Sequence, residues 1–488
     1  MSQLPPNEQP FTSRPVEILE NPYANANRDF HAQMRLFDED LIKKYNRAGP
    51  RYTSYPTALE FVPIMDGKES EILQNRDEKV PLSLYFHIPF CRTLCYYCAC
   101  NKIITKKNSN SGDYLDYLFQ EIKHKRSLLK GNPIIEQVHF GGGTPTFLSD
   151  DELVQLWDFL HEQFTFSDKD TADFGIEIDP RELRPTTLET LRKAGFNRVS
   201  FGVQDLEEKV QIAVNRIQSE ELIRNVMTES RRLGFRSINI DLIYGLPHQT
   251  VDTLANTVAK IIDIAPDRLS VFNYAHLPER FTPQKQIKDE HLPSPADKLT
   301  MLGNTILALN QAGYQYIGID HFALPDDELA IAQREGKLHR NFQGYTTHGD
   351  CDLLGFGVSS ISQIGQHFLQ NDTVLSEYQA KIDNHQLPAV KHIAVKLTDA
   401  LRRYVIMNLL CHDYVDFKDV NMRFSVDAVT YFIDEISELG QMQQDGLVDM
   451  DAKGIRVLPK GRLLGRNVAM VFDEYLNKKH QNRFSKVI

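Results

Sequence analysis

The feature that most constrains this fold is a regular alternation of short apolar runs with amphipathic segments, beginning near Pro81. The runs cover residues 82–88, 134–140, 174–179, 197–203, 237–245 and 269–274. Helix-like stretches such as 113–122 and 151–160 lie between them, and Ser149 with Glu152 forms a capping-box pattern before the second. Six strand-then-helix units predict a parallel β/α architecture.

A partial TIM-like barrel fits this α/β pattern better than a doubly wound nucleotide-binding sheet, because no G-x-G-x-x-G follows the first run. Barrel chemistry gathers at the carboxyl ends of the strands. Polar residues crowd those ends: Cys91 follows the first run, the Gly141–Thr146 turn follows the second, and Glu177 ends the third. Asp241 lies toward the end of the fifth. We therefore expect the active site at this end.

A chain of 488 residues is too long for one ordinary domain. We predict an N-terminal arm and lid segment over 1–75, a barrel domain over 76–370 and a mainly helical domain over 371–488. Residues 1–35 are polar and irregular and predict a loose arm. Residues 44–57 are rich in Gly, Pro, Tyr and Arg, and they predict a loop rather than a core element.

The last hundred residues predict helices over 397–410 and 427–439, a hairpin over 447–458 turning at Lys453 and Gly454, and a closing helix over 462–476. This order is similar to a winged-helix unit. The formal net charge of −11 argues against a nucleic-acid or anionic-membrane surface, so a substrate-covering domain is the preferred interpretation.

The sequence also indicates a compartment. It has no apolar stretch of about 18 residues that could span a membrane, and the N-terminus has no basic start followed by an apolar core. We expect a cytoplasmic protein that has no membrane partner and binds no nucleic acid. In a reducing compartment, clustered cysteines indicate metal or redox chemistry rather than disulfides.

Four of the six cysteines fall within ten residues. Cys91, Cys95 and Cys98 have spacings that can bring three thiolates around an iron–sulfur cluster, and three ligands would leave one of four irons open to a small molecule. With Cys100 the run could instead close a structural zinc or cluster site. A separation of one residue between Cys98 and Cys100 is awkward for one tetrahedral ion. Cys351 and Cys411 are predicted to be ordinary buried cysteines.

Three consecutive glycines, Gly141 to Gly143, precede Thr144, Pro145 and Thr146 after the second predicted strand. Bare backbone of this kind lets a ligand approach closely. A tight strand-to-helix turn is the alternative explanation, and it accounts for one glycine more easily than for three. We predict ligand contact at this turn.

The motifs LYFHIPFCRTLCYYCACNKI, GGGTPT, EIDPRE, FGVQD, DLIYGLP and FQGYTT occur in this order. Together they resemble the oxygen-independent coproporphyrinogen III oxidases, a radical S-adenosylmethionine (SAM) family, from about Tyr45 to the C-terminal domain. The resemblance implies a partial β/α barrel of radical SAM type with a helical cap. It also implies a [4Fe-4S] cluster and two molecules of SAM.

The family converts coproporphyrinogen III to protoporphyrinogen IX in anaerobic haem synthesis. The cluster reduces SAM to methionine and a 5′-deoxyadenosyl radical, which takes a hydrogen from a propionate β-carbon. Loss of carbon dioxide and one electron then leaves a vinyl group, and two propionates react in this way. The resemblance therefore implies an oxidoreductase with coproporphyrinogen III as its substrate. We further expect a small redox protein as electron donor, and a monomer.

The resemblance assigns roles residue by residue. The catalytic set is Cys91, Cys95, Cys98 and Tyr85, of which the three cysteines hold the cluster. Contacts to the SAM on the cluster are assigned to Tyr85, Gly142, Glu177 and Ile361. Contacts to the second SAM are assigned to Tyr97, Gly143, Thr144, Gln204, Arg216, Asp241 and Ala275. Cys100 matches a family cysteine that does not hold the cluster. Two positions depart from the family, with Ala99 in place of glycine and Tyr97 in place of phenylalanine.

These residue types suit the chemistry. Carboxylates such as Glu177 and Asp241 can accept hydrogen bonds from ribose hydroxyls or an amine, and Arg216 can fork onto a carboxylate. Each could also be a plain strand-end charge, and Tyr85 could belong to the core. The substrate carries four carboxylates, so its pocket should hold basic residues. The candidates are Lys44, Arg47, Arg51, Arg181, Arg184 and Arg340. We hypothesise that residues 44–57 close over the active site.

Three other functions compete with this one. A sister branch of the family binds haem and hands it to other proteins, but it usually lacks a cysteine at position 100 and the long N-terminal segment. A radical SAM enzyme with another substrate is the second alternative, and a structural zinc protein is the third.

Overall fold

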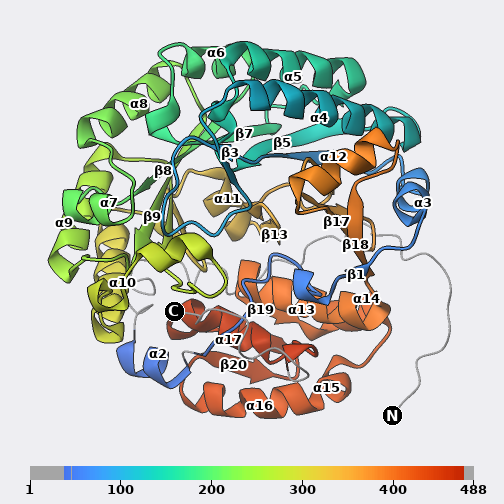
Figure 1. The fold of residues 1–488 in the computed structure, drawn as a ribbon. Helices are drawn as coiled ribbons and strands as arrows, with labels where there is room; N and C mark the ends of the chain where they lie inside the picture. Colours follow the sequence, from blue (N-terminus) through green and yellow to red (C-terminus); the bar gives the residue numbers. More distant parts are fainter. Residues whose placement is uncertain (1–37, 46, 477–488) are drawn as a thin grey trace.

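The computed structural model describes residues 38–45 and 47–476. The predicted loose arm over 1–35 lies outside them. A 14-stranded sheet curves through the larger part of the molecule, and Figure 1 shows helices covering its outer face. Seven of its strands form one continuous parallel run in the order β15, β2, β5, β7, β8, β9, β10. The predicted partial β/α barrel is confirmed.

All six predicted strands are present. The parallel strands are β2 Leu82–Ile88, β5 Ile134–Gly142, β7 Asp173–Ile178, β8 Arg198–Gln204, β9 Ser237–Tyr244, β10 Arg268–Asn273 and β15 Asp352–Phe356. The last was not predicted. Beyond β10 the sheet continues antiparallel through β12 His321–Ala323 and β11 Gln315–Gly318. Beyond β15 it continues through β16 Ile361–Ile364, β17 His367–Asn371, β18 Ala389–Ala394 and β1 Val62–Pro63. The short β6 Thr165–Phe166 pairs with β5.

The barrel helices are α3 Lys68–Gln74, α4 Ser109–Leu128, α5 Asp150–Gln163, α6 Thr187–Ala194, α7 Glu208–Ala213, α8 Glu220–Arg232, α9 Val251–Ile264, α10 Pro295–Gln311, α11 Glu328–Arg334 and α12 Leu375–Asp383. Helix α5 begins at the predicted capping box, where the Ser149 hydroxyl accepts from the Glu152 amide. Such a box satisfies two amides that the first helical turn leaves without partners. Leu153, Leu156 and Leu160 then face the sheet and are buried.

The interior between sheet and helices is apolar and aromatic. Phe86 of β2 lies against Phe140 of β5 and Phe356 of β15, with ring centroids 5.1 and 5.0 Å apart. All three side chains are fully buried. Burial of each such ring stabilises the fold by about 2 kcal/mol. This core fixes the parallel strands and therefore the polar residues at their ends.

The C-terminal region has a hydrophobic core of its own. Its elements are α13 Leu397–His412, β19 Tyr414–Asp416, α14 Phe417–Phe424, α15 Ala428–Tyr431, α16 Ile433–Gln444, β20 Val448–Asp451, β21 Gly454–Val457 and α17 Gly465–Met470. The predicted hairpin is β20 and β21, and β19 adds a third strand. The predicted closing helix over 462–476 is shorter, because residues 459–464 form a 3₁₀ turn before α17.

The segment after α2 Glu39–Tyr45 differs from its prediction as a loop outside the core. Tyr52 and Tyr55 are fully buried in the core of the C-terminal region. The Tyr52 hydroxyl donates to Asp473, 2.9 Å away, and the Glu474 amide donates to the Tyr55 hydroxyl at 3.1 Å. Glycine, proline and arginine gave the segment its loop signature, but the tyrosines between them anchor it. No helix among the described residues is long and apolar enough to cross a membrane.

Candidate active site

The cysteine loop leaves the barrel at the carboxyl end of β2. Its two ends are held together by a short parallel pair, β3 Phe90–Cys91 with β4 Ile103–Ile104. The Ile103 amide donates to the Pro89 carbonyl at 2.7 Å, and the Thr105 amide donates to that of Cys91 at 3.0 Å. Inside the loop, the Asn215 side chain donates to the Leu94 carbonyl at 2.8 Å. The chain itself therefore fixes where the three thiols lie.

Cationic and hydroxyl groups face the thiols. Guanidinium nitrogens of Arg181 and Arg216 lie 3.5 and 3.6 Å from the Cys95 sulfur. Asp179 binds both arginines, at 2.6 and 2.9 Å, and so holds them in place. The Thr144 hydroxyl lies 3.4 Å from the Cys91 sulfur. Positive charge beside a thiol favours its thiolate, which is the form that binds metal.

The thiol pKa values differ along the loop. Burial raises the pKa of Cys91 to about 11. The hydrogen bond from Cys100, followed by the charge of Lys102, lowers the pKa of Cys98 to about 6, although burial opposes this shift. Cys98 is thus more readily ionised than Cys91. Cys100 acts here as a hydrogen-bond donor to a neighbouring sulfur.

The spread of the sulfurs helps to separate a cluster from a single ion. Among the described residues, three ligand atoms within 4.8 Å of one another occur only at Glu136, His348 and Cys351, far from this loop. The loop thiols do not form such a compact group, which a single zinc ion would require. Three thiolates in one loop are the donors that an iron–sulfur cluster takes, and the donor set fits such a cluster.

The glycine turn packs directly against the start of the cysteine loop. The Gly143 amide donates to the Ile88 carbonyl at 2.8 Å, and the Thr144 amide to that of Phe90 at 2.9 Å. A Cβ on Gly143 would lie 2.7 Å from the Pro89 backbone, and Gly142 has a φ of +117°. A Cβ on Gly141 would likewise lie 2.9 Å from Glu177 Oε1. All three glycines are thus explained by the protein's own structure, while ligand contact at the turn stays a prediction.

Glu177 lies near the end of β7 inside the barrel, and both of its carboxylate oxygens have hydrogen-bond partners. His139 Nε2 lies 3.2 Å from one oxygen, and the Gly142 amide donates to the other at 3.2 Å. Burial alone would raise the pKa of Glu177, but His139 and the Gly142 amide outweigh burial and lower it. Glu177 is therefore a carboxylate beside the glycine turn.

Tyr85 of β2 stands beside the same group. Its ring stacks on His139 with centroids 6.1 Å apart, and its hydroxyl lies 3.1 Å from His87 Nδ1. His87 Nε2 lies 3.0 Å from the Asn101 carbonyl, which can only accept. His87 Nε2 must therefore carry the proton, and the Tyr85 hydroxyl donates to Nδ1. Burial lowers the pKa of His87 and keeps it neutral.

Buried polar atoms without hydrogen-bond partners lie at the ends of two further strands, β8 and β10. Gln204 ends β8 at a bulge with a φ of +71°, and its Oε1 is buried without a hydrogen-bond partner, as is Asn273 Oδ1 at the end of β10. Such atoms are costly unless a ligand or water binds them. Asp241 lies on β9 nearby, where burial and then the charge of Glu177 raise its pKa to about 6.

The remaining predicted contacts lie around this end of the barrel. Arg216 is buried against the Gly202 carbonyl, with its Nε unpartnered. The Gln284 side-chain amide donates to the carbonyls of Tyr97 and Ala275, at 3.1 and 3.2 Å, and joins the cysteine loop to the end of β10. Ile361 begins β16, next to β15.

Sequence reasoning missed four residues here. His139 and His87 orient Glu177 and Tyr85, and Asp179 holds both arginines on Cys95. The alternation of polar and apolar residues along IIEQVHF could have indicated His139. Gln343, in the FQGYTT motif, has both side-chain amide atoms buried without partners.

The six basic residues predicted to bind substrate carboxylates fall into three groups according to the partners of their side chains. Arg184 forms an ion pair with Asp150 and donates to two backbone carbonyls, while a guanidinium nitrogen of Arg181 contacts the Cys95 sulfur. Lys44 and Arg47 pair with Asp445 and Glu438 of the C-terminal region, at 2.5 and 4.0 Å.

Arg51 and Arg340 form the last group. Arg51 pairs with Asp320 at 2.7 Å and is about one third exposed. Arg340 donates to the Arg51 carbonyl at 3.2 Å, and its Nη1 is buried without a partner.

Known proteins resemble the chain over most of its length. A radical SAM superfamily model matches residues 85–261, and a HemN C-terminal domain model matches residues 395–464. An oxygen-independent coproporphyrinogen III oxidase of Pseudomonas aeruginosa is 51% identical over 93% of this chain and 99% of its own length. That of Escherichia coli is 50% identical over 93% and 98%.

A solved structure of coproporphyrinogen III oxidase from Escherichia coli, described as a radical SAM enzyme, has a TM-score of 0.86 and 49% identity. It covers 90% of this chain and 99% of its own.

Proposed function

The chain belongs to the oxygen-independent coproporphyrinogen III oxidase family, and from that premise we propose how its residues perform the family's reaction. The chain is a radical SAM oxidoreductase of haem biosynthesis that acts on coproporphyrinogen III. Its superfamily uses a [4Fe-4S] cluster and SAM. When bound, these groups supply the radical that removes a hydrogen from a propionate side chain.

Cys91, Cys95 and Cys98 hold the cluster in this proposal. The pairing of β3 with β4, the two arginines on Cys95 and the hydroxyl of Thr144 support it, because they fix and polarise the thiols. Cys100 stays free of iron and donates to the Cys98 sulfur, which keeps Cys98 ionised.

Glu177, Gly142, Tyr85 and Ile361 would hold the first SAM. Glu177 accepts hydrogen bonds from the ligand's amine or ribose hydroxyls, and His139 with the Gly142 amide keeps it ionised for this task. The hydrogen bond to His87 and the stacking on His139 fix the ring of Tyr85 beside Glu177, where it could contact the ligand. The convergence of thiols, glycine turn and Glu177 at one end of the barrel is the observation that carries the proposal.

A second SAM would be held by Tyr97, Gly143, Thr144, Gln204, Arg216, Asp241 and Ala275. The buried oxygen of Gln204 and the Nε of Arg216 lack partners among the described residues, which supports a polar ligand there. Arg216 offers a donor to the ligand's carboxylate, and Asp241 accepts from its hydroxyls.

Arg51 and Arg340 bind substrate propionates in this proposal. Arg340 Nη1 is buried and unpartnered, and the exposed third of Arg51 leaves its fork accessible. Guanidinium groups bind carboxylates through two parallel hydrogen bonds. Residues 44–57 then contribute to the active site through Arg51, as a segment fixed by Tyr52 and Tyr55 rather than as a moving lid.

We further propose that the protein acts as a cytoplasmic monomer and receives electrons from a small redox protein. The acidic net charge suits a protein that binds neither nucleic acid nor anionic membrane.

The test is an anaerobic assay with reconstituted cluster, dithionite, SAM and coproporphyrinogen III. Protoporphyrin (after oxidation) and 5′-deoxyadenosine should both appear, and the Cys95→Ser variant should yield neither. Deoxyadenosine without the porphyrin would point to another substrate. Neither product from protein with full iron and sulfide, together with stoichiometric haem binding, would favour the haem-carrying alternative.

A further inference from the structure

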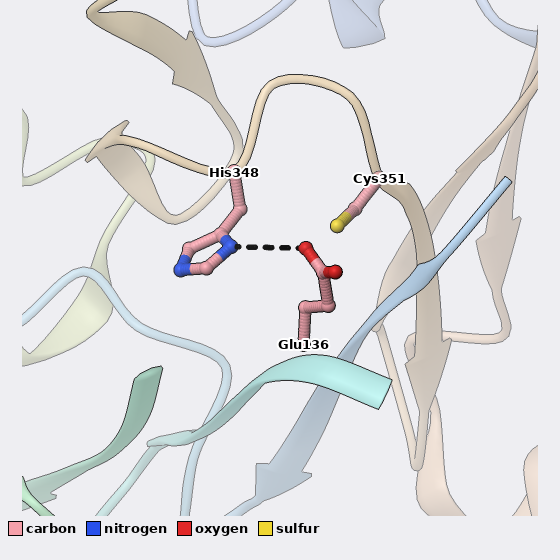
Figure 2. A group of neighbouring side chains, drawn as sticks. All are labelled: Glu136, His348 and Cys351. Carbon is pink, nitrogen blue, oxygen red and sulfur yellow. Dashed lines mark ion pairs between the residues drawn. The ribbon is translucent and has the colours of Figure 1, made fainter. Parts of the chain in front are cut away.

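A second group of metal-ligating side chains lies at the amino end of the barrel strands. Glu136 is near the start of β5, while His348 and Cys351 come from the loop between β14 Gly344–Thr346 and β15 (Figure 2). Six positions of β5 separate Glu136 from Gly142, or about 20 Å at ~3.3 Å per residue. This group is therefore separate from the candidate active site.

The loop holds its two side chains toward Glu136. The His348 amide donates to the Thr346 hydroxyl at 3.0 Å, and the Cys351 amide donates to the His348 carbonyl at 3.3 Å. The Asp352 amide then pairs with the Pro81 carbonyl at 3.0 Å, at the start of the sheet. In Figure 2 the imidazole, the carboxylate and the sulfur point into one space. The backbone thus sets the arrangement of the three ligands.

The distances suit an ion better than a direct bond. The three ligand atoms lie within 4.8 Å of one another, and His348 Nδ1 is 3.9 Å from Glu136 Oε2. That exceeds the 2.7–3.2 Å or so of a hydrogen bond. Two ligands at about 2.1 Å from a tetrahedral ion are roughly 3.4 Å apart. If the two atoms moved about half an ångström closer together, they would reach this separation and one ion could bind both.

The surroundings are those of a partly enclosed site. His348 is buried, and Nδ1 is the ring nitrogen that faces the group, while Nε2 has no partner among the described residues. Lys169 binds the other oxygen of Glu136 and so orients the carboxylate, as outer partners of metal ligands do. Cys351 is partly exposed, which gives an ion and a water molecule a path in.

We propose that Glu136, His348 and Cys351 bind one Zn²⁺ ion, with water in the fourth position. Thiolate, imidazole and carboxylate together are donors that zinc accepts in one tetrahedron. Binding forms a Zn–S bond and releases the thiol proton of Cys351 to solvent. The ion ties the loop before β15 to β5 at the end of the barrel remote from catalysis. Cys351 is then a ligand rather than the ordinary buried cysteine expected from the sequence.

The test measures zinc on anaerobically prepared protein whose iron–sulfur cluster is complete, so that the loop thiols are occupied. Equilibrium dialysis against Zn²⁺, with zinc counted by mass spectrometry, should find one ion per chain. Cys351→Ser and His348→Gln should each weaken binding at least about tenfold, since even loss of an outer partner costs that much. His124→Gln changes a partly exposed histidine of α4 outside this group; it is the matched control and should bind as the unaltered chain does.

A second measurement does not depend on the variants folding. X-ray absorption at the zinc edge of the unaltered, zinc-loaded protein should show one sulfur ligand with nitrogen or oxygen neighbours. Equal zinc binding by all four proteins, or a spectrum without sulfur, would overturn the proposal. Two or more sulfurs would also overturn it, because Cys351 can supply only one. None of these readouts depends on oxidase activity, so the proposed function is tested separately.

Discussion

The two ends of the barrel differ in how their carboxylates are paired. At the amino end, Asp173 pairs with Arg198 at 2.5 Å, and Asp327 pairs with Arg268 at 2.7 Å. Toward the carboxyl end, Asp241 has no ion-pair partner among the described residues, and burial followed by the charge of Glu177 raises its pKa to about 6. Buried polar atoms without hydrogen-bond partners occur at both ends, Arg198 Nη1 at one and Gln204 Oε1 at the other. The unpaired carboxylate therefore distinguishes the carboxyl end, and it suits a site that binds a ligand's donors.

The largest effect should come from the cysteine loop. Replacing Cys95 with serine removes the thiol between Arg181 and Arg216, and product formation should fall by more than about a thousandfold, as for loss of a residue essential to catalysis. Iron content should fall with it. Cys100→Ser is the control in the same loop and should retain its iron. Iron loss in the control would mean that Cys100 is a ligand.

Glu177→Gln tests the carboxyl end without touching the thiols. The change keeps the shape but removes the charge that His139 and the Gly142 amide stabilise. We expect deoxyadenosine formation to fall at least about a hundredfold, or roughly 3 kcal/mol of transition-state stabilisation, with full iron content. Unchanged turnover would show that Glu177 is only a strand-end charge.

Asp327→Asn tests the amino end. The buried guanidinium of Arg268 would lose its counter-charge, which should cost about 3 kcal/mol of unfolding free energy. Activity of the remaining folded protein should change little. Lys193→Ala breaks the exposed pair with Glu189 and should cost under about 0.5 kcal/mol. Denaturant unfolding of both variants measures the difference, and equal costs would contradict the comparison.

The sequence predicted the structural features that depend on residues close together in the chain, and it missed those that depend on distant residues. The six apolar runs became the six predicted strands, and Ser149 capped its helix as expected, because these features depend on near neighbours. The strand β15 was missed, since five residues give too short a pattern. The burial of Tyr52 was also missed, because its partner Asp473 lies near the other end of the sequence.

The two candidate sites differ in the same way, because one is formed by neighbouring residues and the other by distant ones. The spacing of Cys91, Cys95 and Cys98 is local and indicated a cluster directly. The group of Glu136, His348 and Cys351 is assembled from two segments that only the strand pairing of β5, β2 and β15 brings together. No sequence motif indicates this group, so Cys351 was predicted to be an ordinary buried cysteine.

Among the changes at buried residues, the smallest effect should come from Asp241 at the carboxyl end, where it tests the cost of keeping a buried carboxylate. Burial, then the charge of Glu177, raises its pKa from 3.8 to about 6, so the folded protein holds this proton more tightly than the unfolded chain. Stability from this group is full below pH 3.8 and is lost as pH rises through about 6. Asp241→Asn should therefore stabilise the ligand-free protein at pH 7 by about 1–2 kcal/mol, with no gain at pH 4. The same variant should bind SAM more weakly. Denaturant unfolding at both pH values measures the gain, and destabilisation at pH 7 would mean that Asp241 serves the fold rather than a ligand.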